Sequence, residues 1–184
     1  VTLGPQSRRI SADYPGYMKD YIEATGTAET AMFMLAGAGN INPRPAILVG
    51  AGYPRRMGER LGEIVTEAAE KLYPAAAGPV RSATVQWEVV SNRNWPEGSG
   101  RTKGEKITTE LQALRAGDVC LLAIPGELFS EYAALFREGS PFPHTAVVSI
   151  ANDSIGYLPT DDAVPQGGHE VRTGAVPEPI QQEL

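Results

Sequence analysis

The 184-residue sequence is poor in several residue types, and each scarcity removes a class of protein from consideration. It contains one cysteine, Cys120, which cannot form a disulfide within the chain. No stretch approaches the ~18 consecutive apolar residues that a membrane-spanning helix needs. The net charge is −6, and Arg8-Arg9 and Arg55-Arg56 are isolated pairs. The sequence therefore lacks the basic surface that binds nucleic acids or anionic membranes.

Histidine is scarce as well, with only His144 and His169 in the chain. Neither lies in a spaced pair such as HExxH, which would suggest zinc by itself. His144 stands at the foot of an expected strand and is interpreted as structural, whereas His169 lies in the flexible turn GGHE. Unless distant residues converge, this chain alone lacks the four ligands of a tetrahedral zinc site. Cys120, inside the apolar run VCLLAI, is interpreted as a buried hydrophobic residue rather than a nucleophile.

The remaining composition is that of an ordinary globular domain, with 42% hydrophobic and 21% charged residues. Short apolar runs and helical patterns follow one another along the chain. Strands are expected over residues 31–38, 80–91, 118–124 and 145–151, and helices over residues 18–25, 54–72, 107–117 and 127–139. This alternation predicts an α/β layered fold with a mostly buried mixed sheet flanked by helices. The polar, glycine-rich segment 92–105 is expected to be a loop that borders a cleft.

Two side chains just past the ends of expected strands are candidates for a functional site. Glu127 follows Pro125-Gly126 at a strand-to-helix junction, where α/β sheets place their ligand crevice. The simpler alternative is that a carboxylate in the first helical turn is favoured by the helix dipole. Tyr157 lies in the turn NDSIGYLPT, where a tyrosine usually packs its ring and exposes its hydroxyl. Position alone favours the simpler explanation for both residues.

The loop AGNINP, residues 38–43, is a third candidate because it follows the strand expected over residues 31–38. Gly37 and Gly39 permit close approach of another backbone, and Asn40 and Asn42 supply amide donors and acceptors. A turn built on an asparagine side chain explains the same residues equally well.

Taken in order, these segments resemble one family. The chain carries DYPGY, GNINP, PGE at a strand end, N-x-x-x-G-Y-x-P-T and GG-x-E. This series is similar to the second half of the catalytic domain of the neutral/alkaline (non-lysosomal) ceramidase family, over residues 11–172. PGE together with the later tyrosine turn is a fairly specific combination, whereas GNINP alone is not.

The resemblance implies a zinc-dependent hydrolase that cleaves the amide bond of an N-acyl, ceramide-like substrate. It places two of the family's zinc ligands on Glu127 and Tyr157. Two further histidine ligands belong to a region upstream of the matched part, and neither His144 nor His169 matches them. The resemblance also implies that zinc activates the water that attacks the acyl carbon. Asn42 and His169 would then stabilise the developing oxyanion.

The sequence departs from the family at both of these last positions. The family carries a catalytically important serine where this chain has Asn42, and an amide is a poor nucleophile, although it can donate a hydrogen bond to an oxyanion. His169 stands where the family has a tyrosine, and a histidine can polarise a carbonyl or donate a proton near neutral pH. Both changes leave metal-assisted hydrolysis open and place sphingolipid specificity in doubt.

The expected organisation is an incomplete catalytic domain over residues 1–172, followed by a poorly ordered tail over residues 173–184. The expected partners are a small-molecule or lipid substrate and the N-terminal half of the same protein. By resemblance the protein is secreted or periplasmic. Two alternatives stay open: a relative that hydrolyses a different acyl or sugar-linked substrate, and a degenerate, non-catalytic binding domain.

Overall fold

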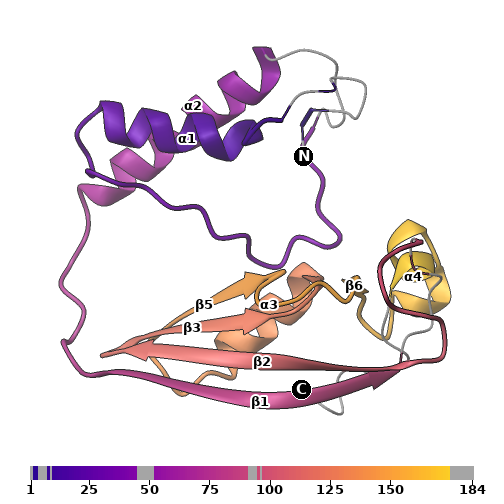
Figure 1. Cartoon of the computed structure of the whole chain (residues 1–184). Coiled ribbons are helices and arrows are strands. Elements are labelled where there is room, and N and C mark those ends of the chain that lie inside the picture. Colours follow the sequence, from indigo (N-terminus) through magenta and orange to yellow (C-terminus); the bar gives the residue numbers. More distant parts are fainter. Residues whose placement is uncertain are drawn as a thin grey trace. The chain divides into compact units, whose positions relative to one another are not determined.

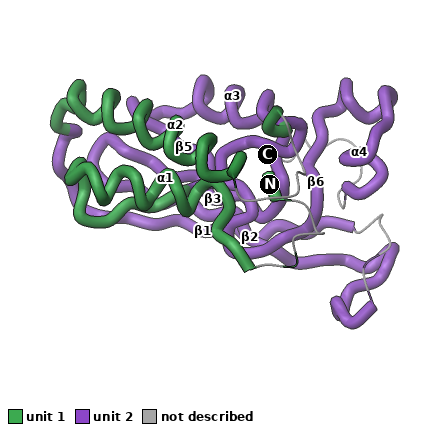
Figure 2. Tube along the Cα trace, turned by 90° about the horizontal axis from the view of Figure 1, so that it is seen from above, with its two compact units in different colours: residues 1–33, 42–74 green, residues 34–41, 75–184 purple. Residues whose placement is uncertain are grey.

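The computed structural model of the chain describes residues 2–3, 8, 10–44, 52–90, 95 and 97–174. The chain divides into two compact units (Figure 2). The first unit comprises Val1–Phe33 and Asn42–Pro74, and its described residues include two helices. The second comprises Met34–Ile41 and Ala75–Leu184, and its described residues include two sheets. None of the helices in the described part of the chain combines the length and apolar character needed to cross a bilayer.

The first unit is a pair of helices, α1 (Asp13–Ala24) and α2 (Gly52–Ala69), which lie along each other (Figure 1). They confirm the helices predicted over residues 18–25 and 54–72. The apolar side chains of Ile64 and Val65 on α2 are exposed. The buried residues of α2 are Pro54, Gly58 and Gly62.

Close contact between the two helices depends on glycine. A β-carbon built on Gly58 would lie 2.4 Å from the carbonyl oxygen of Tyr14 and 2.6 Å from the β-carbon of Tyr17. No side chain fits in that space, so the backbones can approach this closely only where α2 has no side chain. This explains why the buried face of α2 contains glycines, while Ile64 and Val65 lie on its exposed side.

The start of α1 is fixed by the carboxylate of Asp13. It accepts hydrogen bonds from the backbone N–H groups of Thr2 (2.8 Å), Leu3 (3.1 Å) and Tyr14 (2.7 Å), and from the Thr2 hydroxyl. Burial raises the pKa of the Asp13 carboxyl, but these hydrogen bonds outweigh it and lower the pKa below its ordinary value. Asp13 thereby ties Thr2 and Leu3 to the first helix.

The second unit is built on a four-stranded mixed sheet with the order β1-β2-β3-β5 (Figure 1). Its strands are β1 (Val80–Val90), β2 (Lys106–Ala116), β3 (Val119–Ile124) and β5 (His144–Ser149). The first three strands are antiparallel neighbours, whereas β3 and β5 are parallel and are connected through α3 (Ser130–Glu138). The mixed α/β fold expected from the sequence is confirmed.

The helix predicted over residues 107–117 is wrong, because these residues form β2. Leucine, glutamine, alanine and arginine favour a helix locally, but β2 pairs with β1 along its whole length, from Lys106 opposite Val90 to Ala116 opposite Val80. Tertiary pairing of this extent overrides helix propensity, which is worth only tenths of a kcal/mol per residue. The alternating burial of Ile107 and Thr109 shows the two-residue period of a strand.

The strand predicted over residues 31–38 is also wrong, since this segment is irregular. Its carbonyl at Leu35 accepts a hydrogen bond from Ser149 N–H at the end of β5 (2.7 Å). Further on, Gly39 N–H donates to the carbonyl of Leu128 (2.8 Å). The segment therefore contacts two different strands in turn instead of forming a ladder with one of them.

One hydrophobic core holds the second unit together. It lies on the side of the sheet against which α3 packs, and Tyr132 and Ala133 of that helix are buried in it. The buried residues of this core are Trp87, Val89, Ile107, Ile124, Leu128, Phe129, Tyr132, Ala133, Val147, Ile155 and Leu158. Four of them, Leu128, Phe129, Ile155 and Leu158, lie within two residues of Glu127 or Tyr157, so the candidate site is anchored in the core.

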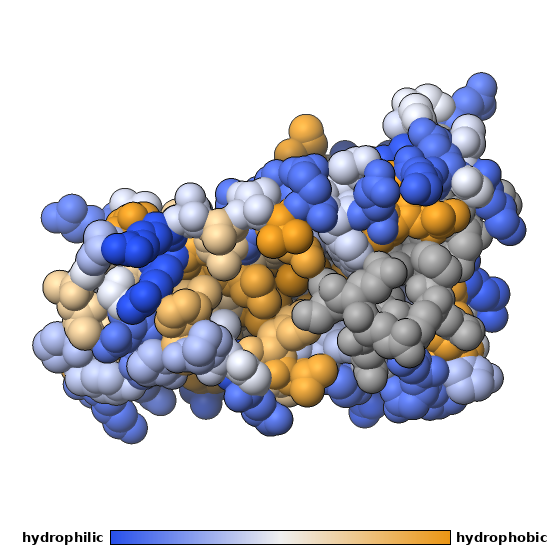
Figure 3. Space-filling model, turned by 90° about the horizontal axis from the view of Figure 1, so that it is seen from below, coloured by the Kyte–Doolittle hydropathy of each residue, from blue (hydrophilic) through white to orange (hydrophobic). Residues whose placement is uncertain are grey.

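Apolar side chains also remain on the surface of the second unit. Val85 on β1 is 62% exposed and Leu135 on α3 is 52% exposed. Figure 3 shows hydrophobic residues gathered in the middle of one face of the molecule, with hydrophilic residues around them.

Replacing Gly58 by alanine tests the helix contact of the first unit. The added methyl group overlaps Tyr14 and Tyr17, so we expect Gly58→Ala to lower the free energy of unfolding by about 1–3 kcal/mol, despite the better helix propensity of alanine. The control is Gly52→Ala on the same helix, where an added β-carbon meets nothing within 4 Å. Urea unfolding measures both variants. An unchanged Gly58→Ala midpoint would contradict the close packing of α1 on α2.

Candidate functional site

The residue pair Glu127 and Tyr157 lies in a short second sheet. β4 (Glu127–Leu128) and β6 (Tyr157–Leu158) are parallel, and Glu127 is directly opposite Tyr157. Glu127 N–H donates to the carbonyl of Gly156 (2.8 Å), and Phe129 N–H donates to the carbonyl of Leu158 (3.2 Å). Paired residues on neighbouring strands stand ~4.8 Å apart and project to the same face of a sheet. The structure therefore brings these two side chains together, although they are far apart in the sequence.

The position of Glu127 excludes the simpler explanation for its presence. The helix predicted over residues 127–139 begins three residues later, because α3 spans Ser130–Glu138. The acidic residue in its first turn is Glu131. Stabilisation by the helix dipole, which falls off within one turn, therefore applies to Glu131 and not to Glu127.

His169 lies next to Tyr157. It begins the short helix α4 (His169–Thr173), which corrects the expectation of a flexible turn at this residue. The two rings meet edge to face, with centroids 5.9 Å apart and an angle of 78° between their planes. Gly174, directly after α4, forms a backbone bridge with Tyr157. Glu127, Tyr157 and His169 thus form one cluster of side chains from three segments of the second unit.

The first part of the AGNINP loop supports the strand that carries Glu127. A β-carbon on Gly39 would lie 2.5 Å from the carbonyl oxygen of Glu127, so the close approach expected at this glycine is confirmed. The side chain of Asn40 donates to both carboxylate oxygens of Glu131 (3.0 and 2.7 Å) and accepts from Ser130 N–H (2.9 Å). Asn40 therefore caps the first turn of α3 from outside the helix.

Asn42 is the one predicted site residue that belongs to the other compact unit, so its predicted role stays a prediction. Its side chain is exposed, and it belongs to the first unit, whereas Glu127, Tyr157 and His169 belong to the second. The predicted tail begins within α4 at Thr173, and residues 175–184 lie outside the described residues.

The donors in the cluster suit a metal ion in part. A glutamate carboxylate is a common zinc ligand, and a tyrosine oxygen is a rarer one that binds after losing its proton. Within the described ranges, no group of three or more histidine, cysteine, aspartate or glutamate side chains is arranged to hold a metal. These residues of the chain therefore offer two adjacent oxygen donors, fewer than the four that zinc takes in a tetrahedral site.

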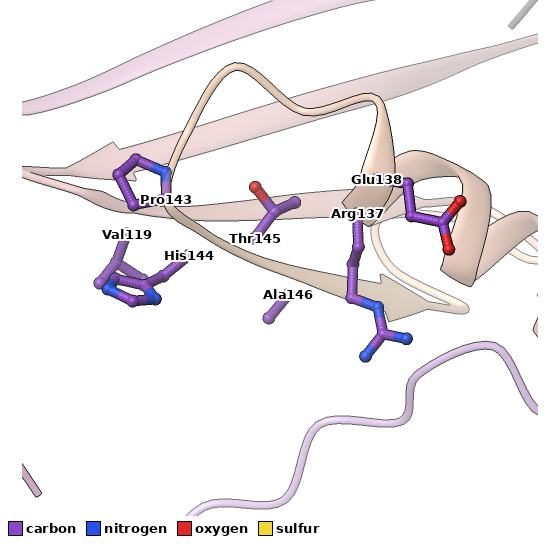
Figure 4. Close-up of a pocket in the computed structure, with 7 residues that line it drawn as sticks. All are labelled: Val119, Arg137, Glu138, Pro143, His144, Thr145 and Ala146. Atoms are coloured by element: carbon purple, nitrogen blue, oxygen red, sulfur yellow. The ribbon is translucent and has the colours of Figure 1, made fainter.

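The remaining candidates lie elsewhere. Cys120 is 4% exposed, and burial raises the pKa of its thiol although Arg115 nearby lowers it, which fits the expected structural role. His144 starts β5 and, with Arg137 and Glu138 at the end of α3, lines a cavity of about 510 Å³ (Figure 4). This cavity lies where β3 and β5 begin. Glu127 follows the other end of β3, so the cavity is separate from the cluster.

Comparisons with known proteins give a likeness of fold. No protein-family model matches the chain, and no curated protein is similar enough in sequence to count as a relative. Among solved structures, the neutral ceramidase from Pseudomonas aeruginosa matches 92% of this chain with a TM-score of 0.70 and 17% identity. A structure described as ceramidase complexed with C2 matches 93% of the chain with a TM-score of 0.72 and 16% identity.

Both matches cover only part of the larger proteins. The chain spans 39% of the length of the first and 40% of the length of the second. At this level of identity the chain shares the fold of that part of the ceramidases, and the likeness extends over nearly all of its own length.

Alanine at position 39 tests the contact beneath Glu127. Because the new methyl group would overlap the Glu127 carbonyl, we expect Gly39→Ala to cost about 1–3 kcal/mol of unfolding free energy and to disturb the pairing of β4 with β6. Gly139→Ala, at the end of α3, is the control, since its nearest contact is 3.3 Å. Urea unfolding compares the two variants, and an equal or larger loss in Gly139→Ala would argue against a tight contact at Gly39.

Proposed function

We propose that this chain is part of a metal-dependent hydrolase of the neutral ceramidase type, which cleaves the amide bond of an N-acyl, ceramide-like substrate. The observation that carries the proposal is the in-register pairing of Glu127 with Tyr157, in a fold shared with neutral ceramidases. Two oxygen donors side by side at the end of a core strand are suited to a metal ion, and His169 beside Tyr157 adds a group that can move a proton.

The proposed metal is zinc, held by Glu127, Tyr157 and two histidines of a region upstream of this sequence. When bound, zinc would act as a Lewis acid toward the acyl carbonyl and make a nearby water more acidic. The whole protein, including the N-terminal half of the catalytic domain, would then be needed for activity. An export route and a lipid substrate are parts of the same proposal.

The residues of this chain would orient the substrate and stabilise charge. The Glu127 backbone is tied to Gly156 by its N–H, so its carboxylate is held on a fixed strand rather than on a loop. His169 would donate a hydrogen bond or a proton to the oxygen of the scissile carbonyl as negative charge develops there. By resemblance, the side-chain amide of Asn42 would donate a hydrogen bond to the same oxygen. An amide is a poor nucleophile, so Asn42 would not attack the substrate as a serine could.

A second candidate is a hydrolase of the same fold with a different acyl or sugar-linked substrate. The sequence observation that favours it is the presence of Asn42 and His169 where the ceramidase family carries serine and tyrosine. The third alternative is a non-catalytic binding domain. It is favoured by the presence of Asn42 where the family carries a catalytically important serine.

Replacing Glu127 by glutamine tests the proposed function directly. Glutamine keeps the size of the side chain but removes the negative charge, so we expect Glu127→Gln in the full-length protein to lose most of its zinc and to hydrolyse a short-chain ceramide at least ~100-fold more slowly. Metal analysis and a hydrolysis assay measure the two effects. The matched control is Glu131→Gln, four residues along the chain, which removes a carboxylate bonded to Asn40 and leaves the cluster unchanged.

The outcomes separate the three candidates. Unchanged zinc content and activity in Glu127→Gln would refute the proposed metal site. Hydrolysis of simple esters without hydrolysis of ceramide would favour the second candidate. A full-length protein without hydrolase activity, whose stability is the same with and without the Glu127 charge, would favour the binding domain.

Zinc binding by the isolated 184-residue chain gives an independent test. With two of four ligands outside this sequence, the chain should bind zinc weakly, well below one ion per molecule at micromolar concentrations. Metal analysis after dialysis measures this stoichiometry. Tight binding of one zinc ion by the isolated chain would contradict the proposed split of the ligands between two regions.

A further inference from the structure

The segment that leads into Tyr157 has an unusual backbone. Between β5 and β6, Ile150 and Asn152 have positive φ angles of 52° and 67°. Asparagine tolerates this left-handed conformation, but a β-branched residue such as isoleucine rarely adopts it. Conformations of this kind persist only where the surrounding structure fixes them, and they concentrate near functional sites. The segment Ile150–Gly156, called the strained turn below, therefore needs strong contacts to hold it.

Backbone hydrogen bonds fix one side of the strained turn against the PGE segment. Ile150 N–H donates to the carbonyl of Gly126 (3.1 Å), and Ile155 N–H donates to the carbonyl of Pro125 (2.8 Å). Gly156 completes the contact by accepting from Glu127 N–H (2.8 Å). Any shift of the strained turn therefore changes the relative position of Glu127 and Tyr157.

Arg101 holds the other side of the strained turn. Its guanidinium donates from one nitrogen to both carboxylate oxygens of Asp153 (2.8 Å each) and from another to the carbonyl of Ser154 (3.0 Å). The same group lies over the ring of Trp95, with its central carbon 4.9 Å from the ring centroid. Asn152 adds a bond from its amide to Glu110 on β2 (3.0 Å). Arg101 comes from the glycine-rich loop before β2, so it joins two segments that are 52 residues apart.

This ion pair differs from an ordinary surface salt bridge. Both side chains are only about one quarter exposed, at 25% for Arg101 and 26% for Asp153. Burial raises the pKa of the Asp153 carboxyl, but hydrogen bonds from Arg101 and Ser154 N–H and the positive charge of Arg101 lower it below its ordinary value. Arginine can place three hydrogen bonds and a flat face against an aromatic ring at once, whereas lysine cannot.

We propose that Arg101 is a positioning residue, which clamps the strained turn and thereby holds Tyr157 opposite Glu127. Its effect on hydrolysis rests on the proposed function, but its effect on the backbone does not. Without Arg101, the strained turn loses three hydrogen bonds and relaxes from its left-handed conformation. Tyr157 then samples positions away from Glu127, while the four-stranded sheet stays intact.

Hydrogen exchange in the full-length protein tests the clamp without any assay of activity. The reporters are the N–H groups of Ile155 and Glu127, which bond across the contact between the strained turn and the PGE segment. We expect Arg101→Gln and Asp153→Asn each to speed exchange at these two amides by about tenfold, with little further increase in the double variant, because both changes remove the ion pair between Arg101 and Asp153. Arg101→Lys keeps the charge and should show the same effect in a smaller degree.

The matched control is Arg115→Gln on β2. Arg115 also lies 4.9 Å from an aromatic ring centroid, that of Phe142, and donates to a carbonyl, that of Gly117 (2.7 Å). Neither of these two contacts involves the strained turn. Exchange at Ile155 and Glu127 should be unchanged in this variant. Unchanged exchange in the Arg101 variants, or an equal increase at the amides of β2 and β3, would overturn the positioning role.

The enzymatic consequence is measured separately. If the parent hydrolyses a short-chain ceramide, Arg101→Lys should lower kcat by about tenfold and leave KM and zinc content near those of the parent, because Tyr157 is misplaced without being removed. Faster exchange with an unchanged kcat would overturn the link between the clamp and catalysis. If the parent has no hydrolase activity and the Arg101 variants still exchange faster than the parent, the result would support the clamp and count against the proposed function.

Discussion

The site depends on a sheet of two residues per strand. A ladder as short as β4 with β6 contributes little by itself, because the backbone entropy lost by ordering its residues is comparable to what its hydrogen bonds supply. It is stable because Leu128 and Leu158, the second residues of the two strands, are fully buried in the core of the second unit. Burial of each leucine, worth about 1.5–3 kcal/mol, fixes the register, and the register then sets Glu127 beside Tyr157.

Adjacent positions of the two short strands differ in burial and polarity. Along each short strand the first residue carries a polar group, and the next residue is apolar and buried. The parallel pair β3 and β5, with α3 between them, provides the rigid frame, and both segments that continue from these strands lead into the short sheet. Polar groups on a rigid frame can be held in one geometry with little reorganisation, which is the condition that electrostatic catalysis requires.

Sequence reasoning found the residues of the cluster because strand ends and turns are marked locally. Pro125-Gly126 and the Gly156 turn signal where strands end, and the family resemblance joined Glu127 to Tyr157. Prediction from the sequence failed where an element or side chain depends on a contact with a residue far away in the chain. β2 reads as a helix until its pairing with β1 is known, and the sequence alone did not show that Arg101 meets Asp153, since neither residue carries a motif. Asn40 was expected only as a generic amide, because its partner Glu131 lies 91 residues further on.

The cap that Asn40 places on α3 joins an irregular segment of the second unit to one of its core helices. The irregular segment 34–41 forms no strand, so it does not pair with the sheet along its length. The side-chain amide of Asn40 links this segment to the first turn of α3 by hydrogen bonds. Without the Asn40 side chain, this segment would keep only its backbone hydrogen bonds at Leu35 and Gly39 to the rest of the unit, and the first turn of α3 would lose its outside partner.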